Sequence, residues 1–257
     1  MRLNTLVRNS IAHRCAMASS SSTRGRPLIL SAIETLDAVF YLCRTGCQWS
    51  ALQETHWCSR CAWKTIYHRF RIWARLRIFD HVFHDLAKKT LAKTSSDMLV
   101  TDTSFIKNIH GRRDQVLGRN RTDRGRMATK LTLLCNSEGL PLHYVLHCGN
   151  KADAGLLRHM LGDAERFIGA LAGYTLMADK GYDSKTCRSA CHALGMSASI
   201  PRRRENDVPW SAGRYVVERS FALIDQYRRL LLRFESKEYT LRAFLSLACA
   251  NLVAKHC

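Results

Sequence analysis

Acidic residues are scarce in this 257-residue chain, and long apolar runs are missing. It has 21 Asp and Glu against 40 Lys and Arg, which gives a formal net charge of +19. A compact body with this surplus attracts polyanions, so nucleic acid or an anionic membrane surface is the expected partner. The longest mainly apolar run, 243–254, is well short of the roughly 20 residues that a membrane-spanning helix needs. The composition therefore favours nucleic acid and predicts no membrane partner.

Several other signals are absent. The chain has no glycine-rich phosphate loop and no GxSxG motif, so NTPase and serine hydrolase readings lack support. It has 11 Cys without a secretory apolar segment, which predicts mostly free thiols in a reducing, cytoplasmic setting. The pairs Cys43/Cys47 and Cys58/Cys61 could form a zinc site, but buried thiols are the simpler interpretation.

Residues 1–27 are basic and partly Ser-rich, and we expect them to form a flexible arm. The stretch up to residue 33 contains Arg but no acid. That composition is typical of a transit peptide and also of a basic DNA-binding arm, and Met17 is an alternative start.

Residues 28–93 are predicted to be a small helical domain. Apolar positions from Ile33 to Cys43 have the spacing of an amphipathic helix that ends near Gly46. A second pattern over 63–74 has an aromatic face and a basic face, with no acid between Ser59 and Phe79. An all-basic helix face suits phosphates, so these helices predict a DNA-binding domain that resembles a helix-turn-helix. The basic residues of this pattern are Arg60, Lys64, Arg69, Arg71, Arg75 and Arg77.

Residues 94–257 alternate between β-prone runs and helical patterns, in the order β-β-β-α-β-α-β-α. Three antiparallel strands followed by strands alternating with helices predict an α/β domain that is RNase H-like. Eight Lys and Arg between Lys107 and Lys130 accompany three Gly, so this segment is predicted to be a mobile basic loop. The expected strands are 98–101, 128–135, 140–147, 174–178 and 197–200, and the expected helices are 152–171, 184–194, 213–232 and 240–255.

Two of the predicted strands end in an aspartate, Asp102 and Asp179. A carboxylate at the end of a buried strand is costly without a cationic partner. Glu218 on the helix 213–232 is a third candidate. Three such carboxylates can bind Mg²⁺, and two ions about 4 Å apart can activate a nucleophile and stabilise a leaving oxygen. The alternatives are salt-bridged strand ends and a surface pair of Glu218 with Arg214.

Six short motifs resemble, in their order along the chain, the DDE transposases of bacterial insertion sequences, in particular the insertion sequence 5 family. The segments Arg44-Thr45-Gly46-Cys47-Gln48-Trp49 and Thr65-Ile66-Tyr67-His68-Arg69-Phe70 resemble the DNA-binding region of that family. The resemblance covers about residues 24–255. The six motifs are Thr101-Asp102-Thr103, Thr129-Lys130-Leu131, Gly139-Leu140-Pro141-Leu142, Gly149-Asn150-x2-Asp153, Ala178-Asp179-Lys180-Gly181-Tyr182-Asp183 and Val217-Glu218-Arg219-Ser220-Phe221.

The resemblance implies that Asp102, Asp179 and Glu218 form a catalytic DDE triad that binds two Mg²⁺ ions, for which Mn²⁺ is expected to substitute. It implies a transposase that binds the terminal inverted repeats of its element and nicks DNA at the ends. The freed 3′-OH would then attack target DNA. A homo-oligomer on DNA, in a bacterial cytoplasm and on the nucleoid when bound, is the matching expectation.

The sequence departs from the family signature Y-x2-R-x3-E-x6-K around the catalytic Glu. Arg214 and Glu218 fit, whereas Ser211 and Asp225 stand at the Tyr and Lys positions. We expect Arg229 to take the role of the missing Lys, because it shares the helix face of Glu218 at the 3.6 period. The basic turn 202–204 is a further candidate. The expected DNA contacts are Lys64, Arg69, Arg71, Arg75, Arg121, Arg124, Lys130, Arg214, Arg228 and Arg229.

Two rival functions are considered. One is a domesticated or inactive protein that binds DNA without cutting it. The other is a tyrosine recombinase, for which His110, Arg113 and Tyr144 mimic part of an Arg/His/Tyr set. Among the remaining polar residues, Asp153 is expected to cap a helix. His143 and His147 are expected to pack or to face DNA.

Overall fold

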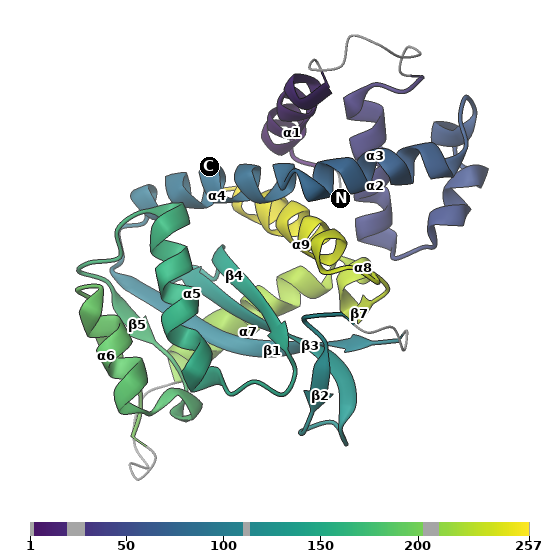
Figure 1. Cartoon of the computed structure of the whole chain (residues 1–257). Coiled ribbons are helices and arrows are strands. Elements are labelled where there is room, and N and C mark those ends of the chain that lie inside the picture. Colours follow the sequence, from purple (N-terminus) through teal and green to yellow (C-terminus); the bar gives the residue numbers. More distant parts are fainter. Residues whose placement is uncertain (1–2, 20–28, 110–113, 203–210, 257) are drawn as a thin grey trace.

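The computed structural model describes residues 3–19, 29–109, 114–202 and 211–256, and Figure 1 shows a helical part beside a sheet covered by helices. The first part contains α1 (Thr5–Ser19), α2 (Ala32–Thr45), η1 (Trp49–Glu54), η2 (His56–Cys58), α3 (Trp63–Arg75) and α4 (Ile78–Lys93). The strands are β1 (Met98–Asn108), β2 (Gly118–Asn120), β3 (Arg126–Asn136), β4 (Pro141–Cys148), β5 (Thr175–Met177), β6 (Ser197–Ser199) and β7 (Leu232–Arg233). The later helices are α5 (Asp153–Ile168), η3 (Lys180–Tyr182), α6 (Lys185–Ala193), α7 (Ser211–Asp225), α8 (Arg228–Leu231) and α9 (Glu238–Val253).

Helix α2 confirms the first amphipathic pattern. Ser31 and Glu34 form a reciprocal capping box at its start, which satisfies backbone N–H groups of the first turn. It ends at Gly46, whose φ of +72° places it in the left-handed region that glycine adopts without strain. Helix α3 confirms the second pattern, with Ile66, Phe70 and Trp73 buried.

Helix α1 corrects the expectation of a flexible arm over 1–27. Leu3, Val7, Ile11 and Cys15 form a buried stripe at a spacing of four residues, and α1 packs against α2 and α4. The apolar stripe was hidden by a basic, polar composition. Residues 20–28 lie outside the described part of the chain.

The sheet confirms the RNase H-like class. Its path is β4-β3-β1-β5-β6, in which β4, β3 and β1 are antiparallel neighbours and β1, β5 and β6 are parallel ones. Numbered by their order along this domain, these five strands lie 3-2-1-4-5, with α5, α6 and α7 following the third, fourth and fifth. Short strand β2 pairs with the first residues of β3, and β7 pairs with the last two residues of β1.

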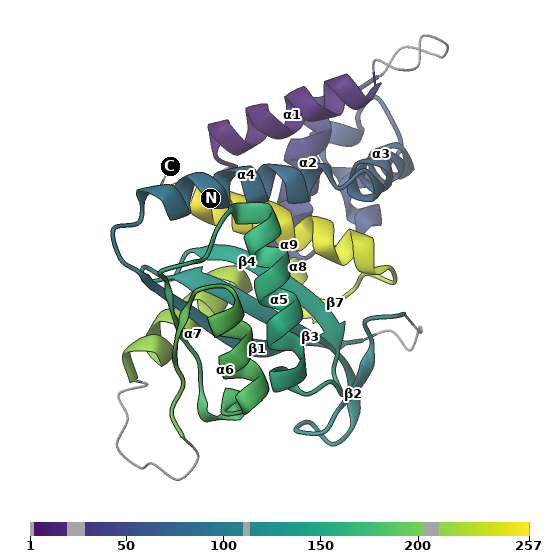
Figure 2. The ribbon, with the colours of Figure 1, turned by 60° about the vertical axis from the view of Figure 1, so that its left-hand side comes forward.

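Helices cover both faces of the sheet, α5 and α6 on one face and α7 on the other (Figures 1 and 2). Neighbouring side chains of β1 alternate between these faces, as a strand requires. Leu99 belongs to the main core, whereas Val100 packs with Val217 of α7. This alternation decides which way the polar residues further along β1 point.

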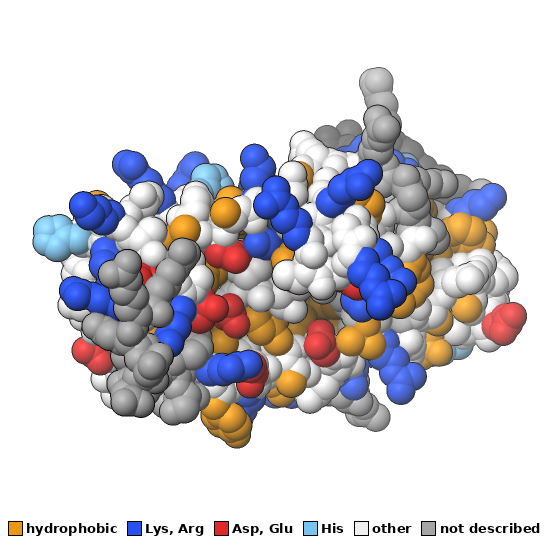
Figure 3. Space-filling model, turned by 90° about the horizontal axis from the view of Figure 1, so that it is seen from below, with side chains coloured by type: hydrophobic (Ala, Val, Ile, Leu, Met, Phe, Trp, Pro, Cys, Tyr) orange, Lys and Arg blue, Asp and Glu red, His pale blue; other side chains and the backbone are white. Residues whose placement is uncertain are grey.

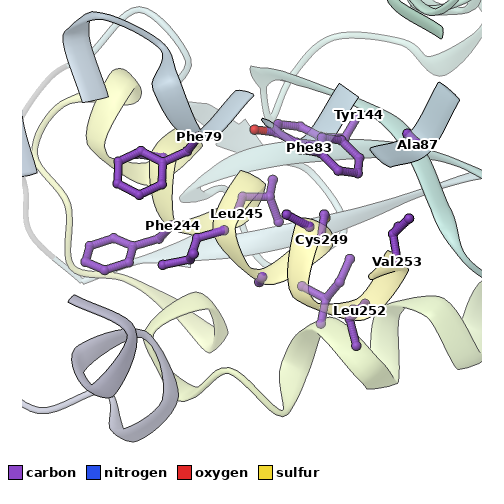
Figure 4. Close-up of a cluster of buried hydrophobic side chains, with 14 of the residues drawn as sticks. Phe79, Phe83, Ala87, Tyr144, Phe244, Leu245, Cys249, Leu252 and Val253 are labelled. Atoms are coloured by element: carbon purple, nitrogen blue, oxygen red, sulfur yellow. The ribbon is translucent and has the colours of Figure 1, made fainter. Parts of the chain in front are cut away.

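The C-terminal helix α9 ties the helical part to the sheet. Figure 4 shows Phe244, Leu245 and Cys249 of α9 beside Phe79 and Phe83 of α4, and these side chains belong to one buried cluster. The cluster includes residues from α1 to α9, so the units proposed at 28–93 and 94–257 share one core. Within the described ranges, no helix is long and apolar enough to cross a bilayer.

Two further expectations were wrong. The helix expected over 213–232 is broken after Asp225, because Tyr227 turns into the core, where its hydroxyl accepts a hydrogen bond from Asn251. The expected mobile loop 107–130 is partly strand, because its two ends belong to β1 and β3, which stay paired as far as Lys107 and Ala128, and β2 lies within it. Residues 110–113 of that segment are outside the described part.

Candidate active site

Asp102 and Asp179 occupy matching positions relative to the parallel pair of β1 and β5, Asp102 within β1 and Asp179 just after the end of β5. The parallel ladder of β1 and β5 ends at the pair Val100–Met177, and each aspartate lies two residues beyond it. The expectation that β1 ends at Asp102 was wrong, because the antiparallel ladder with β3 continues to Lys107. Asp102 thus lies where β1 has a neighbour on one edge only.

The alternation of side chains sends both aspartates toward α7. Val100 packs with Val217 of α7, Met177 packs against the same small cluster, and a residue two places along an extended chain points to the same face. Asp102 follows Val100 by two, and Asp179 follows Met177 by two. Glu218 is next to Val217 on α7. All three predicted acids therefore lie toward the same face of the sheet.

Charge is poorly neutralised around Asp102. Burial raises the pKa of Asp102 to about 6, against the lowering effect of the Thr103 N–H, which donates to its Oδ1 at 2.7 Å. The carboxylates of Asp179 and Asp153 raise that pKa further, and Arg214 lowers it. Two half-buried carboxylates that repel each other can be neutralised together by a divalent cation, because carboxylate oxygens are the ligands that hard cations such as Mg²⁺ prefer.

Glu218 is exposed and forms an ion pair with Arg214, from Oε1 to Nε at 2.8 Å. The geometry is thus the surface pair that the sequence allowed as an alternative. Across the described ranges, no three His, Cys, Asp or Glu side chains lie close enough together to hold a metal ion. The structure brings Asp102 and Asp179 to one face but leaves Glu218 on the guanidinium of Arg214.

The residues around the aspartates are tied down by hydrogen bonds. Thr103 Oγ1 and the buried Tyr182 hydroxyl are 2.8 Å apart, which joins β1 to the turn after β5. Asp179 accepts from the Gly181 N–H at 2.9 Å and so caps η3. On α7, Ser220 donates to the Gly139 carbonyl at 2.7 Å. Several of the family motifs therefore hold the face on which the aspartates lie.

Asp153 and Lys130 form a pair that the sequence reading did not find. Lys130 Nζ lies 2.8 Å from Asp153 Oδ1 and also donates to the Lys151 carbonyl. Lys130 is 4% exposed, which argues against its expected DNA contact. Asp153 makes no capping hydrogen bond at the start of α5, so that expectation was wrong too. The available signal was that both residues belong to family motifs.

Arg229 is also directed inward. Its guanidinium donates to Glu235 Oε1 at 2.6 and 3.0 Å and to the Cys47 carbonyl at 2.7 Å. It is 5% exposed, and the break after α7 removes the shared face with Glu218. The expected transfer of a DNA contact to Arg229 therefore fails.

The other expected DNA contacts differ in how free they are. Arg69 donates to the Leu30 carbonyl and to Thr35, and Arg71 donates to the Tyr239 hydroxyl, so both have structural partners. Figure 3 shows Lys and Arg side chains spread around a few Asp and Glu on the face seen from below. The expected contacts that are exposed are Lys64, Arg75, Arg121, Arg124, Arg214 and Arg228.

The histidines of β4 line a separate cavity of about 570 Å³ between α4, α5 and α9, called here the histidine cavity. His143 Nδ1 lies 3.1 Å from His84 Nε2, and both rings stack on Phe167. Burial lowers the pKa of His84 to about 4 and that of His143 well below its usual range. The packing interpretation of His143 is thus confirmed.

The rival sites find little support. Tyr144 is 3% exposed and is 2.5 Å from Ser246 Oγ, so it is not accessible as a recombinase nucleophile. His110 and Arg113 lie outside the described residues. Burial raises the pKa of the Cys43 thiol, which donates to the Phe244 carbonyl, as a structural thiol would.

Comparison with known proteins gives family matches over both parts of the chain. Residues 12–83 match the family described as "Putative transposase of IS4/5 family", and residues 93–252 match the family described as "Transposase DDE domain". A Burkholderia cepacia protein described as "Putative transposase for insertion sequence element IS402" is 36% identical over 139 residues. That stretch is 51% of this chain and 65% of the relative, so just under two thirds of the relative is matched.

Solved structures give weaker likenesses. The Mos1 transposase in its paired-end complex with the left transposon end has a TM-score of 0.32 at 12% identity, over 88% of this chain and 78% of that one. The piggyBac transposase in a synaptic complex with hairpin DNA has a TM-score of 0.40 at 11% identity, over 80% and 50%. The assignment rests on the second family match, which spans more than half of the sequence. The chain belongs to the family of transposase DDE domains.

Proposed function

We propose that the chain is a DNA transposase that cleaves and rejoins DNA with divalent ions held by Asp102, Asp179 and Glu218. The observation that carries the proposal is the matched placement of Asp102 and Asp179, two residues beyond the last β1–β5 pair and on the α7 face. Family membership gives that placement its chemical meaning. Glu218 joins the other two when it exchanges the Arg214 guanidinium for a metal ion.

Mg²⁺, or Mn²⁺ in its place, would activate a water molecule or a 3′-OH for attack and stabilise the leaving oxygen. The residues of the chain would fix where this happens. The Thr103 N–H orients the Asp102 carboxylate, and the turn Lys180–Tyr182 holds Asp179. Lys130 neutralises the neighbouring Asp153, which leaves Asp102 and Asp179 as the negative centre.

DNA would be held by exposed cations on several elements. The terminal inverted repeats of the element and the target DNA are the proposed partners, bound through phosphates by Lys64 and Arg75 of α3, Arg121 and Arg124 of the β2–β3 turn, and Arg214 and Arg228. Two ends must be joined to one target, so a homo-oligomer assembled on DNA is the matching proposal. Nucleoid association would follow from DNA binding.

The test incubates the full-length protein with its own flanking DNA and Mg²⁺ and looks for nicks at the repeat ends. Asp102→Ala, Asp179→Ala and Glu218→Ala should each abolish cleavage while DNA binding in EDTA persists. Asp97→Ala is the matched control, because Asp97 is an exposed aspartate just before the same strand. Cleavage by any triad variant at the wild-type rate would remove that residue from the site.

A second candidate is a protein that binds the same DNA without cutting it. The exposed Glu218–Arg214 pair favours it, because this pair separates Glu218 from the two aspartates. The outcome that selects it is sequence-specific binding of the repeats with no Mg²⁺- or Mn²⁺-dependent nicks. A protein–DNA adduct that forms in EDTA would contradict both candidates.

A further inference from the structure

A second cavity, of about 820 Å³, lies where α1 and α2 meet η2 and the start of α8. None of the candidate active-site acids lines it. Its wall combines the ring of Phe40 with three further rings and three arginines. The further rings are Tyr41, His56 and Trp57, and the arginines are Arg8, Arg44 and Arg228; we call this the aromatic cavity.

Three rings of the aromatic cavity, Tyr41, His56 and Trp57, form a tilted cluster. Trp57 lies 5.2 Å from Tyr41 and 4.3 Å from His56, measured between ring centroids, with interplanar angles of 51° and 39°. Tyr41 is 39% exposed, although a large aromatic ring gains free energy from burial. The exposed Tyr41 ring therefore offers a surface on which a further planar group can lie.

The cations of the aromatic cavity outnumber its acids. Arg8 is neutralised by Asp37, with Nε 3.0 Å from Oδ1. Arg44 donates to the Gln226 carbonyl at 3.1 Å and lies over the Tyr227 ring, which fixes its position without cancelling its charge. Within the described ranges, neither Arg44 nor the exposed Arg228 makes an ion pair. The cavity therefore joins a stacking surface to a positive wall.

We propose that the aromatic cavity binds an unpaired nucleobase of a DNA strand, stacked on the exposed Tyr41 ring beside Trp57, with its phosphate at Arg44 and Arg228. Aromatic stacking beside Arg is the chemistry that holds single-stranded nucleic acid. The idea rests on the proposed function only in that DNA is the partner. Helix α7 connects the candidate active site to the aromatic cavity. Glu218 lies about 10 Å along the helix axis from the last residue of α7, and Arg228 follows shortly after that residue.

The test measures binding of a short single-stranded oligothymidylate to the full-length protein in EDTA, by fluorescence anisotropy. A matched strand with abasic sugars keeps the phosphates and removes the bases. Tyr41→Ala should weaken oligothymidylate binding about 5- to 100-fold, with abasic-strand binding unchanged. Tyr41→Phe should bind as the wild type does, since the ring is kept.

Arg228→Gln should weaken binding of both strands, because the phosphate contact does not depend on the base. Arg158→Gln is the matched control, since Arg158 is an exposed arginine on α5, away from the aromatic cavity. Equal wild-type affinity for the two strands, or an equal loss for both in Tyr41→Ala, would overturn the proposal. Competition by free thymidine monophosphate at the concentration of oligonucleotide phosphate would also overturn it, in favour of a nucleotide site. If the wild type prefers oligothymidylate to the abasic strand but shows no Mg²⁺-dependent cleavage, the result counts against the proposed function alone.

Discussion

The carboxylate site at Asp102 and Asp179 and the histidine cavity beside β4 both hold ionisable groups that burial penalises, yet they are neutralised differently. In the histidine cavity His84 and His143 hydrogen-bond each other, and burial keeps both rings uncharged. Nearby, Asp80 accepts from Ser246 at 2.5 Å and from Arg77 at 2.9 Å. At the carboxylate site Asp102 has one backbone N–H, two acidic neighbours and Arg214, whose charge has the smallest effect of these on its pKa.

This difference in neutralisation indicates that the histidine cavity is structural and that the carboxylate site is suited to bind a cation. In the histidine cavity only the two facing ring nitrogens are paired, and His84 Nδ1 and His143 Nε2 are buried without a hydrogen-bond partner among the described residues, so both rings are held neutral. At the carboxylate site a charged group with too little counter-charge costs free energy that the rest of the fold must offset. Such a cost is typical of a functional site. The comparison therefore predicts opposite responses of the two regions to protonation, to neutral substitution and to Mg²⁺.

The largest expected effect is the pH dependence of stability. Folding lowers the pKa of His84 to about 4 from the usual 6.5, mainly by desolvation, and that of His143 in the same direction. The stability that depends on the neutral rings is complete above pH 6.5 and is lost as the pH falls toward 4, by about 2 kcal/mol at pH 5 for His84, and His143 acts in the same direction. Asp102 acts in the opposite sense between pH 4 and about 6, because folding raises its pKa.

Urea unfolding between pH 7.5 and about 5 checks this prediction. The free energy of unfolding should fall with pH in the wild type and in Asp102→Asn alike. His84→Gln should flatten the dependence, because one ring that must stay neutral is removed. A free energy of unfolding that does not change down to pH 5 would contradict the interpretation that His84 and His143 are held uncharged in the folded protein.

Next in size is the effect of one isosteric substitution made in each region. Asp80→Asn should lower the free energy of unfolding by about 1–3 kcal/mol, because Asp80 is 4% exposed and its charge pairs with Arg77. Asp102→Asn should leave it unchanged or raise it by about 1 kcal/mol at pH 8, since a poorly paired charge is removed. Asp97→Asn, at an exposed position, is the control and should change nothing. Equal losses for Asp80→Asn and Asp102→Asn would remove the distinction between the two regions.

Local patterns predicted much of this arrangement. The β-prone runs that end in an aspartate, together with the family motifs, pointed to Asp102 and Asp179, and the 3,4 spacing predicted α2 and α3. What they missed depends on long-range contacts. Asn251 draws Tyr227 into the core and ends the helix that carries Glu218, so Arg229 meets Glu235 instead of solvent.

The pairing of Lys130 with Asp153 belongs to the same class of tertiary effect, because it joins β3 to α5 across 23 positions of sequence. Helix α1 shows a different limit. The four apolar residues of its buried stripe are visible in the sequence, but the prediction for this segment was based on its polar and basic composition. For Glu218, the sequence allowed both a role as metal ligand and a pair with Arg214, and only the geometry shows that the pair with Arg214 forms.

The smallest expected effect concerns Arg214, a cation that lowers the pKa of Asp102 and is bonded to Glu218. Mg²⁺ should raise the thermal midpoint of the wild type, because a ligand that binds only the folded state stabilises it. The Mg²⁺ concentration for half of this rise should be several-fold lower in Arg214→Gln, since Glu218 is released and a competing positive charge is removed. Without Mg²⁺ the midpoint should not move, because both partners of the pair are exposed. Asp179→Asn should abolish the Mg²⁺ response, whereas Arg158→Gln should keep the wild-type one. A half-rise concentration that increases in Arg214→Gln would mean that Arg214 helps to assemble the carboxylate site, and the contrast with the histidine cavity would then rest on Asp102 alone.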